Sequence, residues 1–558
     1  MAIVPRSDQS YIFSPRGKSL PCLLPSRTPW GTTSSYFLSS SNLLLAMDLE
    51  GASVTQELPP TGDQCDVQPF LDEYGLEYTP DGQFIRWSCL NKEHPRNWPA
   101  SRKIYDTGLI IFLDLFTTSV STAGSAAADH ARDEFGLSKT LAVFLFVSLS
   151  LLGQMIGGSI FPACSEAFGR KKLYIVSTGL FSLFCLIGGV VPSIAAVAIG
   201  RFFSGFLSAI PAVVVAGSIE DMYNAKDRVW FIFLWAVVAN MGLALGPIMS
   251  IYIIAHLSWR WVFRISAIVT AIITLLLFGI RESRPSSVLE KQVAKLRRES
   301  GIPNLKALNP DHTPDLKTFV RLSLFRPIHL FFTEPIVFVV ATMSAVAFAL
   351  IYLFTEALPP IYMSMGFSTT SSYLPFLAIC IGILFGLLTR IVDHRIIVRY
   401  QEQGIPLEPE HKLLGFSVGA PILALGLWWF SWTIPPTVHV HWLISTAALI
   451  LIGYAVNEFD SVLAGYLADS YLGYAASGFA AVQLLRSSMS AAFPLFAIDM
   501  FDSLGANVAS SILAALATFF CIVPPLFNRH GRRIRGLSKF AKHSLQVYQE
   551  NGVDKHGY

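Results

Sequence analysis

Four acidic residues stand in stretches of the sequence that are otherwise apolar: Asp114, Glu356, Glu458 and Asp460. A charged side chain at the centre of a bilayer costs about 2.5–3.5 kcal/mol on insertion scales, so ionisable residues kept inside membrane helices are functional by default. A carboxyl group that cycles between its charged and neutral forms can carry a proton. The four acids are therefore candidate proton-coupling residues. For each of them the alternative is structural, a pair with an arginine or with the backbone.

One arginine lies in a similar setting. Arg201 belongs to an apolar stretch, where an arginine must face an aqueous cavity or a carboxylate. Because the turn Val191-Pro192-Ser193 comes shortly before it, the alternative is that its side chain extends to the lipid headgroups at the outer interface.

Helices in a bilayer must position these side chains. The chain of 558 residues is 53% hydrophobic and only 14% charged, which exceeds the apolar content of a soluble globular protein. It supplies a dozen apolar stretches, each of about 20 residues, the length that crosses ~30 Å of hydrocarbon. We therefore expect an all-α polytopic membrane protein with twelve transmembrane helices in two six-helix halves.

The twelve expected helices fall into two sets. The first runs near 104–124, 141–162, 173–192, 195–218, 229–253 and 261–280, and the second near 336–357, 373–391, 413–433, 442–464, 477–498 and 508–527. The connector between them, residues 281–330, holds ten Lys or Arg and five Asp or Glu. Six plus six around a charged connector is the pattern of two related halves that rock about a site at the membrane midplane.

The expected domains follow from the same pattern. They are a disordered cytoplasmic N-terminal tail at 1–100, a first half at 101–280, a cytoplasmic central loop at 281–330, a second half at 331–528 and a cytoplasmic tail at 529–558. Basic residues gather on one side of the expected helices, which places both termini in the cytoplasm. Whether residues 1–46 belong to the mature protein stays open, because Met47 begins a more conventional acidic start.

The loop after the second expected helix carries a distinctive pattern, formed by Ser165, Glu166, Gly169, Arg170 and Lys171. It resembles the signature loop between helices 2 and 3 of the major facilitator superfamily, in which an acid, a tight glycine turn and basic residues clamp neighbouring helix ends. The loop departs from the general pattern at two positions, since Pro162 replaces Gly and Glu166 replaces Asp. The alternative is that the basic run is only a topology signal.

Two further motifs support this resemblance. Arg201-Phe-Phe-Ser-Gly205 looks like the superfamily's Arg-x-x-x-Gly motif. The run Gly242-Leu-Ala-Leu-Gly246-Pro247 resembles the Gly-x-x-x-Gly-Pro element of its antiporters, although the Gly-Gly that follows in the family is absent. Glycines four residues apart let helices approach closely, and proline allows a kink. The element favours antiport over uptake.

Several motifs resemble the twelve-span fungal drug:proton antiporter family more specifically. They are Asp221-Met-Tyr with Arg228, Trp259-Arg260-Trp261-Val262-Phe263, the run from Tyr466 to Tyr471, Arg486-Ser487, and Phe493-Pro494-Leu495-Phe496. The similarity covers nearly everything from Trp98 to Arg535. It implies a proton-coupled transporter that exports drugs, toxins or secondary metabolites by alternating access. The plasma membrane is the implied location, with the vacuolar membrane as the alternative.

The resemblance also implies where the candidate residues lie. Helices 1, 4, 7 and 10 line the cavity of this fold, so four residues are expected to converge there: Asp114, Arg201, Glu356 and Glu458. Asp460 stands two residues after Glu458, so one of these two acids faces elsewhere. Which carboxylate carries the proton stays open.

Other classes of function fit the sequence less well. The seven cysteines form no C-x-x-C pair and the twelve histidines are dispersed, so neither a metal site nor an intramembrane enzyme is expected. A phosphate-binding loop is absent, and a net charge of +3 does not suggest nucleic acid. We expect no cofactor, a small-molecule substrate and protons as partners in the bilayer, and a monomer. Proton-linked uptake on the same fold and a non-transporting sensor remain as alternatives.

Overall fold

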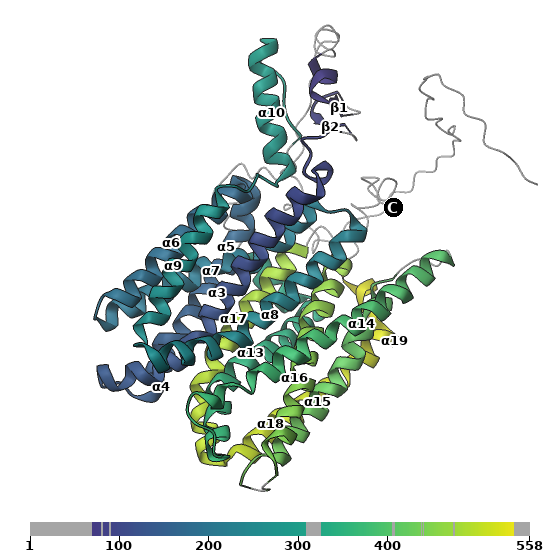
Figure 1. Cartoon of the computed structure of the whole chain (residues 1–558). Helices are drawn as coiled ribbons and strands as arrows, with labels where there is room; N and C mark the ends of the chain where they lie inside the picture. The colour runs from purple at the N-terminus through teal and green to yellow at the C-terminus, as the bar shows by residue number, and fades with distance from the viewer. Residues whose placement is uncertain are drawn as a thin grey trace, which may run out of the picture. The chain divides into compact units, whose positions relative to one another are not determined.

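The computed structural model describes residues 70–79, 82–88, 91–308, 325–403, 408–436, 438, 440–471, 475–538 and 540. Within this part of the chain, 12 helices are long and apolar enough to cross a membrane. They fall into two sets of six, which confirms the expected all-helical fold and the position of every expected span (Figure 1). The expected disorder of residues 1–69 lies outside the described residues.

The first half contains seven named α-helices and one π-helix. They are α3 (Ala100–Phe135), α4 (Lys139–Val143), the π-helix η3 (Phe144–Ser148), α5 (Leu149–Phe168), α6 (Arg170–Val190), α7 (Ile194–Met222), α8 (Ala225–His256) and α9 (Arg260–Leu277). The helix α3 continues well past its expected end at residue 124, because the small residues from Ala126 to Ala128 are buried in the protein instead of forming a loop. It ends at Gly136, whose φ of 63° is left-handed.

The second half follows the same plan. It contains α12 (Arg326–Thr333), α13 (Pro335–Ser364), η5 (Ser371–Tyr373), α14 (Phe376–Glu402), η6 (Pro409–Lys412), α15 (Leu414–Thr433), α16 (Trp442–Tyr471), α17 (Ala475–Leu504), α18 (Ala506–Phe520) and α19 (Val523–Leu537). The last span combines α18 and α19. The two halves meet where α5 packs against α17 and α8 packs against α14.

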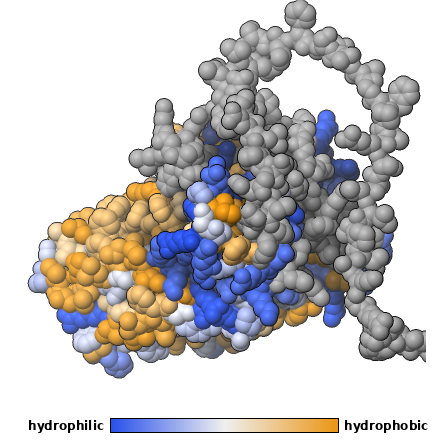
Figure 2. All heavy atoms as spheres, turned by 90° about the horizontal axis from the view of Figure 1, so that it is seen from above, coloured by the Kyte–Doolittle hydropathy of each residue, from blue (hydrophilic) through white to orange (hydrophobic). Residues whose placement is uncertain are grey.

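Apolar side chains cover the outer faces of several helices. Leu275 on α9 is 71% exposed and Leu388 on α14 is 60% exposed, as expected for side chains that face lipid. Seen from the end that carries β1 and β2, hydrophobic residues occupy much of the visible flank, and hydrophilic residues gather mainly in the middle of the view (Figure 2). This distribution is the one that a bilayer requires.

Glycines bring the helices into close contact. A Cβ atom at Gly242 or Gly246 of α8 would overlap the threonine hydroxyls of Thr118 and Thr122 on α3, so the Gly-x-x-x-Gly spacing forms a helix contact here. The tightest approach is at Gly205 on α7, where a Cβ atom would overlap the backbone carbonyl of Ser150 on α5. Since a carbonyl inside a helix cannot swing aside, only glycine fits at this position.

We predict that Gly205→Ala destabilises the protein by at least about 2 kcal/mol, because the added methyl group must push α5 and α7 apart. Thermal unfolding in detergent measures the effect. Gly188→Ala is the matched control, since a Cβ atom at Gly188 meets nothing within 4 Å. Equal melting temperatures for the two variants would contradict the close packing of α5 against α7.

Residues 70–98 fold together with the start of the connector, whereas residues 1–100 were expected to form a disordered tail. The strand β1 (Leu76–Tyr78) pairs antiparallel with β2 (Ile85–Trp87), and α10 (Pro285–Ser300) packs against this hairpin (Figure 1). Their shared apolar core consists of Leu71, Leu76, Ile85, Leu289, Val293, Leu296 and Leu305. We call residues 70–98 together with 285–308 the hairpin cap.

The hairpin cap could not be predicted from the sequence, for a physical reason. Leu289, Val293 and Leu296 follow the spacing of one helix face, but they lie in a segment that is polar overall. Their partners in the hairpin are short strands about 200 residues earlier in the chain. Neither half of this core is long enough to stand out as an apolar run.

Polar contacts fasten the cap. Asn91 donates from Nδ2 to the carbonyls of Tyr74 and Gly75, at 2.8 and 2.9 Å. Trp98 is buried in the apolar core of the first half, and its Nε1 donates to the carbonyl of Glu93 at 3.2 Å. The motif before the first span therefore joins the cap to the membrane helices.

His94 begins η2 (Pro95–Asn97) as its N-cap. Burial, with the positive charges of Arg96 and Lys103, lowers the pKa of His94 to about 4. The ring is therefore neutral at physiological pH, and its Nδ1 accepts a hydrogen bond from the backbone N–H of Arg96 at 3.1 Å. The same ring packs edge-on against Trp87 of the hairpin.

Candidate functional site

A cluster of charged, amide and aromatic side chains lies where the two halves meet. Its residues are Asp114 on α3, Trp235 and Asn240 on α8, Phe348 on α13, Asn457 and Asp460 on α16, and Arg486 on α17. We call this group the central cluster. Both halves contribute to it, so any rocking of one half against the other must change its geometry.

Two residues of the second half, Asp460 and Arg486, form an ion pair in the central cluster. Arg486 Nη1 lies 2.6 Å from Asp460 Oδ1, and the guanidinium lies over the ring of Phe348, 3.9 Å from its centroid. From the first half, Asn240 Nδ2 reaches Asp460 Oδ2 at 3.3 Å and Asn457 Oδ1 at 3.4 Å. Asn240 thus bridges the halves at the ion pair.

Asp114 is the remaining acid of the central cluster. Its side chain is 1% exposed, and its Oδ2 accepts a hydrogen bond from Trp235 Nε1 at 2.6 Å. The charges of Arg486 and Asp460 both act on it. Because Arg486 already pairs with Asp460, the central cluster holds one carboxylate more than it holds cations.

Several buried polar atoms of the central cluster have no hydrogen-bond partner among the described residues. They are Asp114 Oδ1, Asn240 Oδ1, Asn457 Nδ2 and Arg486 Nε. Buried polar atoms are normally paired, so a group of unpaired donors and acceptors at one place needs an explanation. The central cluster can offer both donors and acceptors to a small polar molecule.

A second set of contacts joins the halves nearer the ends of α3 and α13. Ser125 Oγ donates to Glu356 Oε1 at 2.6 Å, and Ser121 Oγ lies 2.9 Å from Tyr352 Oη. Ser125 follows Asp114 by eleven residues, about 16 Å along a helix axis. Glu356 is therefore not part of the central cluster, and the expected convergence of Glu356 with Asp114 is not seen.

Arg201 does not lie where it was expected. It is 3% exposed and donates only to uncharged oxygens in the described part of the chain: the carbonyls of Val120, Ser121 and Phe146, and Ser150 Oγ. It therefore faces neither a cavity carboxylate nor the headgroups. The physical reason lies in the π-helix η3, which contains Phe146. The backbone carbonyl of Phe146 accepts a hydrogen bond from Arg201 Nε at 2.6 Å, so the guanidinium is held inside the first half.

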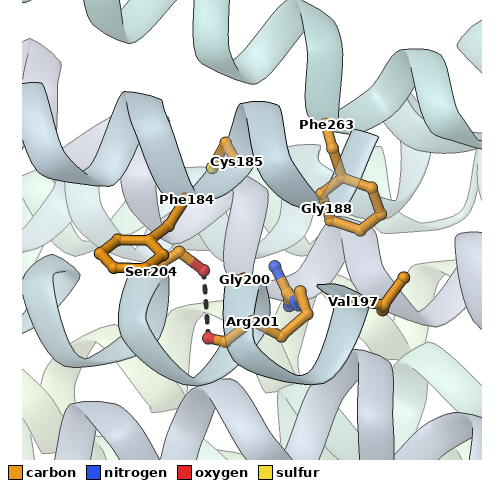
Figure 3. Close-up of a pocket in the computed structure, with 8 residues that line it drawn as sticks. All are labelled: Phe184, Cys185, Gly188, Val197, Gly200, Arg201, Ser204 and Phe263. Atoms are coloured by element: carbon orange, nitrogen blue, oxygen red, sulfur yellow. Dashed lines mark hydrogen bonds between the residues drawn. The ribbon is translucent and has the colours of Figure 1, made fainter. Parts of the chain in front are cut away.

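A small pocket lies beside Arg201, between α6, α7 and α9 (Figure 3). It is lined by Phe184, Cys185, Gly188, Val197, Gly200, Arg201, Ser204 and Phe263. The guanidinium lies 5.4 Å from the centre of the Phe263 ring. Most of this lining is apolar and belongs to the first half alone, so we assign it to helix packing.

Glu458 also differs from its expected position. Its carboxylate points into the second half, against Gly386 on α14 and Gly415 on α15, and its Cβ lies against Gly419 on α15. Asp460 is the acid of this pair that faces the first half. One of the two does face elsewhere, as expected, but Glu458 does not converge with Asp114.

The signature loop lies at the end of the first half that carries the cap. Arg170 Nε is 2.6 Å from Asp221 Oδ2, so this pair links α6 to α7. Ser165 Oγ donates to the carbonyl of Pro162 at 2.7 Å, and the charge of Glu166 acts on Arg170. Lys171 Nζ donates to the carbonyl of Phe278 at 3.0 Å. All these contacts lie within the first half.

Glu282 is a member of this loop site that the sequence did not suggest. Its carboxylate accepts from the backbone N–H groups of Arg170 and Lys171, at 2.8 and 3.1 Å, and so caps α6. At Gly169, where φ is 86°, a Cβ atom would lie 2.7 Å from Glu282 Oε2. An acid directly after the sixth span, flanked by Arg281 and Arg284, was the available signal.

The remaining predicted residues lie in α8 and α17. Pro247 is inside α8, one residue after Gly246. Ser487 is buried beside Arg486 and lies within 3.1 Å of Gln483 Nε2. Phe493 packs against Phe496, and Pro494 is inside α17. Among the described residues there is no group of three His, Cys, Asp or Glu side chains that could hold a metal ion.

Asn240 was missed because a single amide in an apolar run carries no motif. Its signal was its position, the only Asn within the apolar stretch of the fifth expected span. A polar side chain there must find a partner, and it finds Asp460 across the boundary between the halves.

Known proteins resemble this chain over most of its length. The family model described as Major Facilitator Superfamily matches residues 108–494. A multidrug transporter of Candida glabrata is 32% identical over 489 residues, which cover 87% of this chain and 83% of that protein. The MFS transporter of the ascochitine biosynthesis cluster of Didymella fabae is 31% identical over 468 residues, covering 83% of this chain and 90% of that protein.

A solved structure shares the fold. The xylose transporter XylE from E. coli, in a partially occluded inward open conformation, has a TM-score of 0.53 and 15% sequence identity. The match covers 76% of this chain and 97% of that chain. At this identity the likeness concerns the arrangement of the helices alone.

Proposed function

The chain belongs to the major facilitator superfamily, and on that premise we propose that it is a proton-coupled secondary active transporter that exports small organic compounds by alternating access. The family consists of transporters, not enzymes. The observation that carries the proposal is the charge balance of the central cluster, in which Asp114 is left over after Arg486 pairs with Asp460. A buried acid without its own cation is suited to exchange a proton for a substrate.

The cycle follows from this balance. With a proton on Asp114 the central cluster is neutral, and the halves can change their orientation with little desolvation penalty. Release of the proton to the cytoplasm leaves one negative charge, which the substrate then neutralises or displaces. After the halves rock, a proton from outside returns to Asp114 and the substrate leaves.

The substrate class is proposed from two supports. The relatives include a multidrug transporter and a transporter of a biosynthesis cluster, which favours drugs, toxins or secondary metabolites. The aromatic rings of Trp235 and Phe348 stand beside the unpaired polar atoms of the central cluster, so a flat compound with polar edges suits the site. The glycine–proline element of α8 supports export over uptake.

Location and assembly belong to the same proposal. The chain is a multi-pass membrane protein, and we place it in the plasma membrane, with the vacuolar membrane as the alternative. Basic residues of the signature loop and of α19 indicate that these ends are cytoplasmic. We propose that it works as a monomer, since the central cluster is formed within one chain.

A transport assay on the reconstituted protein tests the proposal. Liposomes loaded with a lipophilic cation, a polyamine or a secondary metabolite receive an imposed pH gradient, with and without a protonophore. We expect substrate to move against the proton flow and to stop when the protonophore is added. Movement of substrate with the protons would replace export by uptake, and no gradient-dependent movement of any compound would favour a sensor.

A further inference from the structure

Glu458 lies in a space that the glycines Gly386, Gly415 and Gly419 leave open, which we call the glycine seat. It is 2% exposed, and its side chain lies against two other helices of the second half, α14 and α15. A Cβ atom at Gly415 would overlap its Oε2, one at Gly386 would lie 3.0 Å from its Oε1, and one at Gly419 would lie 3.1 Å from its Cβ. Three glycines from α14 and α15 thus leave room for this one acid.

The seat provides no hydrogen-bond donor to the carboxylate from the described residues. An ionised carboxylate that is buried without donors or a close cation carries a penalty of several kcal/mol, which a protonated carboxyl group avoids. The glycine seat therefore accommodates Glu458 in its neutral form.

The charged groups that face Glu458 come from α14. Gly386, Arg390 and Asp393 follow the spacing of one helix face, so the seat continues into an acid and a base along α14. Both residues act electrostatically on Glu458, and their mutual contact is loose, with Arg390 Nη1 3.9 Å from Asp393 Oδ2. Arg390 Nε and Asp393 Oδ1 are buried and have no hydrogen-bond partner in the described part of the chain.

Tyr454 is a further titratable group whose charge couples to that of Glu458. On its own helix, Tyr454 Oη lies 2.7 Å from Thr389 Oγ1 and is occupied by that contact. On α15, Gly415 and Gly419 lie against Glu458. Arg390 is thus the cation whose charge acts on Glu458 and that can stabilise its ionised form.

In this structure Arg390 is engaged elsewhere. Its guanidinium lies over the ring of Phe233 on α8, 5.2 Å from the centroid, so it bridges the two halves. Nearby, Trp230 of α8 packs against His394 of α14. If α8 and α14 separate at this end when the halves rock, Arg390 loses Phe233 and becomes free to pair with Glu458.

We propose that Glu458 is a second proton site, distinct from Asp114, which holds its proton while α8 and α14 are in contact and releases it when Arg390 turns toward it. The released proton leaves the carboxylic acid as H⁺ and passes to the Asp393 carboxylate or to water at that end of α14. This inference rests on the proposed function and adds a group through which the contact between the halves controls proton release.

Infrared spectroscopy of the full-length protein in liposomes tests the proposal without any substrate. The carbonyl band of protonated carboxylic acids is followed while the pH is raised. We expect the wild-type band to contain a titrating component that is missing in Glu458→Gln, and a different component that is missing in Asp114→Asn. Glutamine is the neutral isostere of the protonated acid, so the glycine seat must accept it.

Arg390→Gln provides an independent readout. Without its guanidinium the Glu458 component is expected to persist to higher pH, because the anion has lost its cation. Arg395→Gln is the control, since Arg395 is exposed on the same helix and is expected to leave the band unchanged.

Three results would overturn the inference: a carboxyl band unaltered by Glu458→Gln, a Glu458 component that does not titrate, or a Glu458→Gln protein that fails to fold. The band does not depend on transport. A titrating Glu458 in a protein that moves no substrate against a proton gradient would therefore overturn the proposed function and leave the proton site standing.

Discussion

We expect the Asp114→Asn substitution to abolish proton-driven transport, while the protein still folds and reaches the membrane. Asparagine has the shape of aspartate and can still accept the hydrogen bond from Trp235 Nε1, so packing at the site is preserved. It cannot take up or release a proton, however, and the central cluster loses its excess negative charge. Transport driven by an imposed pH gradient is expected to fall by at least about 100-fold, to the uncoupled background.

The measurement compares initial rates in liposomes with and without the pH gradient. Asp133→Asn is the matched control on the same helix, because the Asp133 side chain is 82% exposed. Its ion pair with Arg132, at 3.6 Å, is exposed to solvent and contributes little to stability. Its rate is expected to equal that of the wild type. An Asp114→Asn protein that keeps its response to the gradient would remove Asp114 from the coupling mechanism.

The second large effect concerns the ion pair of the central cluster. Arg486→Gln leaves Asp460 largely buried without its cation, and breaking such a pair from one side typically costs about 3–5 kcal/mol of stability. The cation–π contact with Phe348 is lost as well. Since the pair is partly exposed, with 15% and 21% of the two side chains accessible, we expect the lower end, about 3 kcal/mol.

A double-mutant cycle separates the pair from its members. The variant with both Arg486→Gln and Asp460→Asn is expected to be more stable than Arg486→Gln alone, because it leaves no charge unpaired. Thermal unfolding in detergent gives the four values. Arg86→Gln in the hairpin cap is the control, since its pair with Glu77 is exposed and is worth less than about 1 kcal/mol. Additive effects of the two central substitutions would show that the residues do not interact.

The sequence predicted the membrane helices well because burying an apolar residue in lipid is a local property. Asp114 and Asp460 stood out for the converse reason, since charges in apolar runs are rare, whereas Arg486 was named only as part of a family motif. What the sequence does not determine is direction around a helix. Glu458 and Asp460 are two residues apart, about 200° around the helix, and only the packing of α14 and α15 decides which of them faces the other half.

Arg201 shows a different limit. Three of its four partners are carbonyls of α3 and of the π-helix η3, and backbone oxygens have no sequence signature. The sequence therefore identified Arg201 as an arginine in an apolar stretch, but it did not show that its partners are backbone carbonyls instead of a carboxylate. Glu356 lies on α13, and its distance from Asp114 depends on the level at which α3 meets α13.

The hairpin cap has a consequence for how the chain is made. The hairpin leaves the ribosome before the first membrane helix, but the apolar face of α10 that covers Ile85 is synthesised only after six spans have followed. Roughly 200 residues separate Ile85 from Leu289, a delay of about 10–40 s at ordinary translation rates. During that time the apolar side of the hairpin lacks the helix that covers it. The cap can therefore form only after the first half of the protein has been completely synthesised.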